Sequence, residues 1–230
     1  MDGLYLLFIL TFIFSLVVQF KVSSTFNKYS HVSAGQGRTA FQVARRILDA
    51  HGLFDVRIER VRGNLTDHYD PRAKVLRLSD TVHDSASASA VGVAAHEVGH
   101  AIQHAERYAP IVWRTKLVPV VNAASRFSWI AILLGVFITY SSVVLGSYMI
   151  YAGIIMFAAT TLFHLVTLPC ELNASRRALT ELELLGGYTS AELANSKKVL
   201  GAAAMTYVAA LAMSAIQLLR LIRIYGNRRD

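Results

Sequence analysis

The sequence predicts a mainly α-helical, multi-pass membrane protein with a small β-sheet. Hydrophobic residues make up 54% of the 230 residues and charged residues only 17%, a balance typical of membrane proteins that carry a modest polar domain. Long apolar runs alternate with polar segments, and the polar segments contain short runs with the periods of helices and strands. The composition therefore argues against a soluble protein.

The net charge of +8 does not indicate a nucleic-acid partner. Lys and Arg flank apolar runs and form no basic patch interleaved with aromatic residues, so anchoring against anionic lipid headgroups of the bilayer is the simpler interpretation. Cys170 is the one cysteine, which excludes an internal disulfide framework and a thiolate-cluster metal site.

The first apolar run extends from Gly3 to Phe20 and ends at Lys21. It lacks the basic start of a secretory signal, and Val22-Ser23-Ser24 is a poor match to a cleavage site. We therefore expect residues 1–20 to be retained as a transmembrane helix. Polar sequence follows from residue 21 to residue 126.

Within this polar segment, Thr39 to His51 has the period of a helix that stops at Gly52. Asp55 to Arg62 alternates around Val56 and Ile58, and Val75 to Leu78 is a short apolar run. Together they predict a small sheet of two or three strands. The block between them, Leu65 to Pro71, is compatible with a strand or with a well-capped turn.

A further helix is predicted from about Ser85 to Tyr108, with Pro110 as its stop. It contains His96-Glu97-Val98-Gly99-His100, an H-E-x-x-H pattern. Histidines four residues apart lie one turn apart on one helix face, so both imidazoles can bind one zinc ion, with Glu97 beside them as a general base. The alternative is a surface helix with two unrelated histidines, which leaves the placement of Glu97 unexplained.

The second half of the chain is dominated by apolar sequence. Phe127 to Leu168 contains no Lys, Arg, Asp or Glu and would extend about 60 Å as a single helix, about twice the hydrocarbon thickness. We therefore expect residues 127–170 to form a transmembrane hairpin, with its turn in the region of Tyr140-Ser141-Ser142 and Gly146-Ser147. The other expected segments are a polar helical segment (171–198), whose second helix begins with a capping box at Thr189 to Glu192, a transmembrane helix (199–220) and a basic tail (221–230).

A hydrolytic zinc site normally has three protein ligands and an open position. His104 lies about 12 Å along the helix axis from His96, too far for one ion. Glu106 is disfavoured because the chain lacks the glycine that would turn it back toward the metal. Glu171, which we expect to begin a polar helix just after Pro169, would complete a His-His-Glu set. Its alternative role is a helix N-terminal acid that favours the dipole.

Three blocks of the sequence carry a family resemblance: Leu65 to Pro71, Ala94 to Gln103 and Leu168 to Arg177. Together they resemble the YugP-type neutral zinc metallopeptidases of bacterial membranes, over nearly the whole chain. More distantly the chain is similar to the gluzincin membrane proteases, including the CAAX prenyl protease and heat-shock HtpX types. The resemblance implies a multi-pass protein of the bacterial cell membrane whose segment 21–126 is zincin-like and catalytic.

The resemblance also implies the site residues: one Zn²⁺ ion held by His96, His100 and Glu171, with Glu97 as the catalytic residue. Gluzincins often carry an Asp four residues after the ligand Glu, which supports the site through a hydrogen bond. This chain has Ser175 at that position, so the support should be weaker or come from another residue such as Asn173.

The expected function is hydrolysis of peptide bonds by an endopeptidase. Zinc would activate a water molecule, and Glu97 would take its proton and deliver it to the leaving amine. Four residues are candidates for a second oxyanion donor or a substrate contact: His68, Tyr69, Arg176 and Arg177. The substrate would be a peptide or protein, including membrane-associated ones, and the strand near Leu65 to Tyr69 could pair with it by β-augmentation.

A hairpin at 127–170 would place both polar segments on one side of the membrane, as a shared zinc site requires. Basic residues near the span ends favour the cytoplasmic side for this catalytic part. The alternative function is a non-catalytic zinc-binding membrane scaffold or regulator, although a structural zinc site usually has four protein ligands. A small transporter is disfavoured because the apolar runs of the expected spans (Gly3 to Phe20, Phe127 to Leu168 and Val199 to Leu219) contain no Asp, Glu, Lys or Arg.

Overall fold

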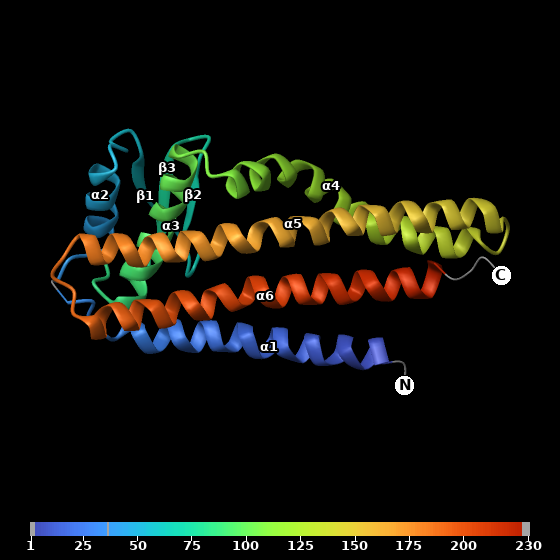
Figure 1. Cartoon of the computed structure of the whole chain (residues 1–230), viewed down its shortest axis with the longest axis horizontal. Helices are drawn as coiled ribbons and strands as arrows, with labels where there is room; N and C mark the ends of the chain where they lie inside the picture. Colours follow the sequence, from blue (N-terminus) through green and yellow to red (C-terminus); the bar gives the residue numbers. More distant parts are fainter. Residues whose placement is uncertain (1–2, 36, 227–230) are drawn as a thin grey trace. The chain divides into compact units, whose positions relative to one another are not determined.

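A computed structural model describes residues 3–35 and 37–226 of the chain (Figure 1). It confirms the predicted fold class, mainly α-helical with a small sheet. The elements in chain order are α1 (Gly3–Ser30), α2 (Ala40–Ala50), β1 (Arg57–Val61), β2 (His68–Asp70), β3 (Val75–Ser79), α3 (Ala88–Ala105), α4 (Ala109–Ile138), α5 (Val143–Leu184) and α6 (Ser190–Gly226).

Four of the described helices, α1, α4, α5 and α6, are long and apolar enough to cross a membrane. The chain divides into two compact units. One is built from three separate stretches of the chain and the other from two. The first holds described residues 3–17, 112–168 and 207–226, and the second holds described residues 18–35, 37–111 and 169–206. The first unit is the more apolar one, and the second contains α2, α3 and the sheet.

The sheet of the second unit has the strand order β1-β3-β2, with β1 parallel and β2 antiparallel to β3. Strand β2 is therefore an edge strand. The block Leu65 to Pro71, which the sequence left open as a strand or a turn, contains strand β2 and the start of a turn. In this turn Asp70 Oδ1 accepts the backbone N–H groups of Arg72 and Ala73. Asp67 ties the start of β2 to the end of β3 through the backbone N–H and the hydroxyl of Ser79.

Helix α3 packs against α2 and against the sheet in this unit. Its alanines and valines let it approach its neighbours closely, and the fully buried residues Val91, Ala94 and Val98 lie in one core with Ile47 and Leu76. Helix α2 begins with a capping box, in which Thr39 and Gln42 satisfy each other's backbone N–H groups. The interior of this unit thus holds α3 in a fixed place.

In the first unit, α4 and α5 form the predicted hairpin with its turn at residues 139–142. The expected turn region is too wide, because Gly146 and Ser147 lie inside α5. Glycines bring the two arms together: a Cβ atom at Gly135 would lie 2.8 Å from the Gly146 carbonyl oxygen, and one at Gly153 would lie 2.7 Å from the Ser128 carbonyl oxygen. Small residues allow this kind of close helix packing in membranes.

Several predicted helix limits are wrong. Helix α5 continues through Pro169, so Glu171 lies inside a long helix and does not begin a polar one. Proline removes one backbone hydrogen bond, but a helix that is long and well packed on both sides of it can continue. Helix α6 runs as one helix from Ser190 to Gly226, and α1 continues past residue 20 to Ser30, so both helices are longer than the membrane segments expected within them. Pro110 does not stop α3, which ends at Ala105, but lies in the first turn of α4, where proline is well tolerated.

Candidate metal centre

The H-E-x-x-H histidines lie one turn apart on α3 and face a carboxylate from α5. The ring centroids of His96 and His100 are 4.8 Å apart. Glu171 Oε2 lies 3.2 Å from Nε2 of His96 and 3.5 Å from Nε2 of His100. One possible ligand atom from each of the three residues lies within 4.8 Å of the others. The structure therefore brings together two residues of one helix with a third from a helix some seventy positions later.

This donor set fits a zinc ion. Glu171 is only 1% exposed, and a carboxylate buried to that extent needs compensating positive charge or hydrogen bonds. Two imidazole nitrogens and one carboxylate oxygen are ligands that zinc prefers. Because Glu171 lies inside α5, its role as a helix N-terminal acid is ruled out. The ligand hypothesis is the one that the geometry supports.

Gly99, between the two histidines in the sequence, allows α3 to lie directly against α5. A Cβ atom at this position would lie 2.8 Å from the carbonyl oxygen of Ala174 and 3.3 Å from its Cα atom. Those are backbone atoms, which cannot yield as a flexible side chain does. The absence of a side chain at Gly99 thus sets the helix separation at which Glu171 can reach both histidines.

His100 is held by a buried glutamine. Its Nδ1 atom lies 2.9 Å from Oε1 of Gln103, and the amide nitrogen of Gln103 donates to the carbonyl oxygen of Cys170 at 2.8 Å and to Oδ1 of Asn173 at 2.9 Å. Gln103 is 0% exposed. The glutamine therefore links a candidate ligand on α3 to the stretch of α5 that carries Glu171.

His96 is held by Ser175, whose hydroxyl oxygen lies 3.1 Å from Nδ1 of the imidazole. Gluzincins often carry an Asp at this position. Ser175 therefore supports His96 from the expected position, but with an uncharged hydroxyl group. Asn173, the alternative, contacts Gln103 and Arg177. Both histidines are thus oriented through Nδ1 by uncharged side chains, leaving Nε2 of each toward Glu171.

The protonation of His100 is set by opposing influences. Burial alone would lower the pKa of its imidazole, but hydrogen bonds with Cys170 and Glu171 and the negative charges of Glu97 and Glu171 raise this pKa to about 10. Without a metal ion, His100 is therefore an imidazolium paired with Glu171 at neutral pH. A metal ion that binds here takes the place of that proton.

Glu97 contacts the edge strand of the sheet. Its Oε2 atom accepts a hydrogen bond of 3.1 Å from the backbone N–H of Tyr69 in β2. The sequence block that contains Tyr69 is therefore joined directly to the H-E-x-x-H helix, a contact that the residue pattern alone did not show. The aromatic ring of Tyr69 lies against that of His104, with centroids 5.8 Å apart.

Two of the other predicted site residues are engaged elsewhere. His68 Nδ1 is bonded to the carbonyl oxygen of Thr66, and its Nε2 lies 3.3 Å from Arg77. Arg177 forms an ion pair of 2.7 Å with Glu106, which explains the position of that acid without a metal. Arg176 is exposed on α5.

Sequence reasoning missed the roles of Gly99 and Gln103. The signal for Gly99 was present, since glycine inside an alanine-rich helix costs about 1 kcal/mol relative to alanine and so indicates a close approach by another backbone. Gln103 occupies the position of the missing glycine before Glu106 and was given no role of its own. Its spacing of three residues from His100 places it on the same helix face, where a buried amide needs partners.

The fold and the centre together define a protein with four described helices that are long and apolar enough to cross a membrane, and with a His-His-Glu cluster that could hold a metal ion. Residues 4–226 match the model of a family described as "Putative neutral zinc metallopeptidase", and the chain belongs to this family. It is 50% identical over 213 residues to "Putative membrane protease YugP" of Bacillus subtilis (strain 168), an alignment that covers 92% of each chain. The predicted family is thus confirmed. No solved structure matches the chain.

Proposed function

We propose that this protein is a membrane-embedded zinc endopeptidase that binds one zinc ion through His96, His100 and Glu171. The observation that carries the proposal is the buried His-His-Glu cluster with Glu97 on the same helix. Zinc supplies Lewis acidity toward the scissile carbonyl and the attacking water. Within the described residues the cluster offers three ligands, which favours an open, hydrolytic site over a closed structural one.

Glu97 is proposed as the general base and then the general acid. Its carboxylate takes a proton from the attacking water and delivers that proton to the leaving amine. The hydrogen bond from the backbone N–H of Tyr69 to Oε2 orients the carboxylate, so Oε1 is the oxygen that is positioned for proton transfer. This bond also places the outer edge of β2 beside the centre.

We further propose that β2 binds the substrate peptide as an added strand, since it is the edge of the sheet on the side of Glu97. Of the four candidates for a second oxyanion donor, Tyr69 has the most support because His68 and Arg177 have other partners. Burial raises the pKa of the Tyr69 phenol, and the charges of Asp55 and Asp70 raise it further. The phenol therefore keeps its proton at neutral pH and can donate it in a hydrogen bond.

The function is tested with the purified full chain, a generic unfolded protein as substrate, and metal analysis. Glu97→Gln should keep its zinc content and lose hydrolysis by about 10²-fold or more. The matched control is Glu183→Gln, an exposed acid on α5, which should behave like the wild type. Hydrolysis by Glu97→Gln at the wild-type rate would overturn the mechanism. A wild-type protein that holds zinc but cleaves nothing would favour the scaffold function.

The orientation of the chain is also a proposal. We propose that all four candidate spans cross the membrane and that the catalytic part faces the cytoplasm, on the basis of the basic residues near the span ends. Cleavage of the 21–126 segment by an added protease in intact cells would contradict this orientation, whereas cleavage only after the cells are opened would agree with it.

A further inference from the structure

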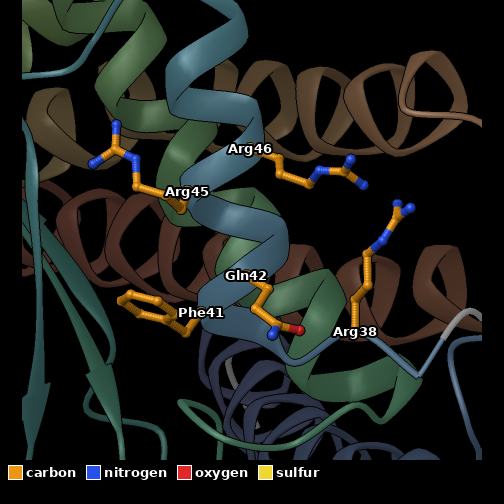
Figure 2. Close-up of a pocket in the computed structure, with 5 residues that line it drawn as sticks. All are labelled: Arg38, Phe41, Gln42, Arg45 and Arg46. Carbon is orange, nitrogen blue, oxygen red and sulfur yellow. The ribbon is translucent and has the colours of Figure 1, made fainter.

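A pocket of about 430 Å³ lies beside α2, and none of its lining residues is assigned to the metal centre. Its lining consists of Arg38, Phe41, Gln42, Arg45 and Arg46 (Figure 2). Three guanidinium groups around one pocket concentrate positive charge, and such a concentration is costly unless negative charge neutralises it. The partners of each arginine therefore decide what the pocket can bind.

Arg45 is fully engaged by the protein itself. Its guanidinium forms an ion pair with Asp49 at 2.8 Å, and two of its nitrogens donate to the carbonyl oxygens of Val56 and Leu53 at 2.6 and 2.9 Å. In Figure 2 its guanidinium points to the opposite side of α2 from those of Arg38 and Arg46. Arg45 is therefore a structural residue that fastens α2 to the loop before β1.

Arg38 and Arg46 lack such partners. Their guanidinium groups extend to the same side of α2 and approach one another (Figure 2). Among residues 3–35 and 37–226, no carboxylate forms an ion pair with either of them, and the buried Nη1 atom of Arg38 has no hydrogen-bond acceptor. A buried donor without an acceptor costs free energy, so an acceptor supplied from outside the protein would stabilise this arrangement.

Tyr188, in the turn between α5 and α6, is not among the residues that line the pocket, but it lies close enough to Arg38 and Arg46 for their charges to act on its phenol. Its hydroxyl oxygen is buried and has no hydrogen-bond partner in the described part of the chain. Burial raises the pKa of this phenol, while the nearby charges of Arg38 and Arg46 lower it. The negative charge of Glu192 also raises the pKa of the Tyr188 phenol. The Glu192 carboxylate accepts the backbone N–H of Thr189 as part of a capping box.

We propose that Arg38, Arg46 and Tyr188 form a binding site for a phosphate group, carried by a small soluble molecule or by a lipid headgroup. Two guanidinium groups match the charge of a phosphate, and its several oxygens can accept from all three side chains. The pocket is larger than a bare phosphate requires, which leaves room for a substituent on the phosphate. This site is independent of the proposed peptidase activity.

The test is the thermal unfolding midpoint of the purified full chain in detergent, measured in inorganic phosphate and in chloride at equal ionic strength. Binding to the folded state should raise the midpoint with phosphate concentration. Arg46→Gln, at an exposed position, should fold normally and lose most of this rise, and Tyr188→Phe should reduce it. Arg62→Gln, a matched change at another exposed arginine, should leave it unchanged.

A second arm distinguishes the sources of the phosphate. Micelles doped with phosphatidylglycerol are compared with micelles doped with diacylglycerol, which has the same chains but no phosphate. A rise with the lipid alone identifies a headgroup site, and a rise with inorganic phosphate alone identifies a soluble ligand. If neither probe raises the midpoint, or if the variant Arg38→Gln/Arg46→Gln shows the same rise as the wild type, the proposal is wrong.

Discussion

The Nδ1 atom of His100 lies 2.9 Å from the Oε1 atom of Gln103, a side chain with no exposed surface. A glutamine Oε1 atom can only accept a hydrogen bond, so the proton of the imidazole lies on Nδ1. The lone pair of the neutral ring is then on Nε2, the nitrogen that faces Glu171. The amide group of Gln103, held by Cys170 and Asn173, thus selects the tautomer that can bind a metal ion.

Replacing Gln103 by Leu should weaken zinc binding by about 10–100-fold, because His100, a proposed ligand, loses the group that orients it. The measurement is competition with a chromophoric chelator. Gln103→Glu keeps an acceptor for His100 and should recover part of the affinity, which a loss of packing would not explain. Gln19→Leu, at an exposed position of α1, serves as the matched control. Equal affinities for Gln103→Leu and the wild type would contradict the assigned role.

Ser175 offers a second test of orientation, at the other histidine. Ser175→Ala removes the 3.1 Å contact with Nδ1 of His96 and should weaken zinc binding by about tenfold. Ser175→Asp restores the charged partner that gluzincins often use, which makes the imidazole a more basic ligand, so zinc should bind at least as tightly as in the wild type. An Asp variant that binds zinc more weakly than the Ala variant would show that the helix spacing cannot accept a carboxylate there.

The sequence was sufficient for the parts of the fold that depend on local pattern. The spacing of His96 and His100 predicted one helix face, and the capping box at Thr189 predicted the start of α6. The apolar tract after Arg126 predicted the hairpin because its length is about twice the membrane thickness. These features need only neighbouring residues or a simple length argument.

The features that were missed depend on tertiary contacts. Pro169 indicated a helix boundary, but the packing of α5 overrides this local preference and places Glu171 inside the helix. The contact between the Tyr69 backbone and Glu97 joins an edge strand to a helix across many residues, and backbone donors have no residue-type signature. Gln103 and Ser175 are recognisable as supports only once α3 and α5 are known to be adjacent.

Zinc binding should release about one proton from His100 at neutral pH, because the pKa of its imidazole is about 10 without a metal ion. A raised pKa means that the proton stabilises the metal-free site below this pH and is lost only above it. Zinc must displace that proton, so the apparent affinity should fall as the pH falls. Isothermal titration calorimetry in buffers of different ionisation enthalpy counts the protons. No release at pH 8 would contradict the charged state of His100.

The approach of α3 to α5 is tested at two glycines of the same helix. A Cβ atom at Gly99 would lie 2.8 Å from the carbonyl oxygen of Ala174, whereas the nearest atom to one at Gly92 would be the Cβ atom of Ser196, at 3.4 Å. Gly99→Ala must therefore push the helices apart, which should destabilise the fold by about 1–3 kcal/mol. Zinc affinity should fall with it, because Glu171 moves away from His96 and His100.

Gly92→Ala is the matched control, because it adds the same methyl group at ordinary contact distance. It should keep zinc affinity and be neutral or slightly stabilising, since alanine favours a helix by about 1 kcal/mol over glycine. Thermal unfolding with and without chelator separates the effect on the fold from the effect on the metal. If both variants hold zinc as tightly as the wild type, the close contact at Gly99 does not position the centre, and Glu171 is held in place by other parts of α5.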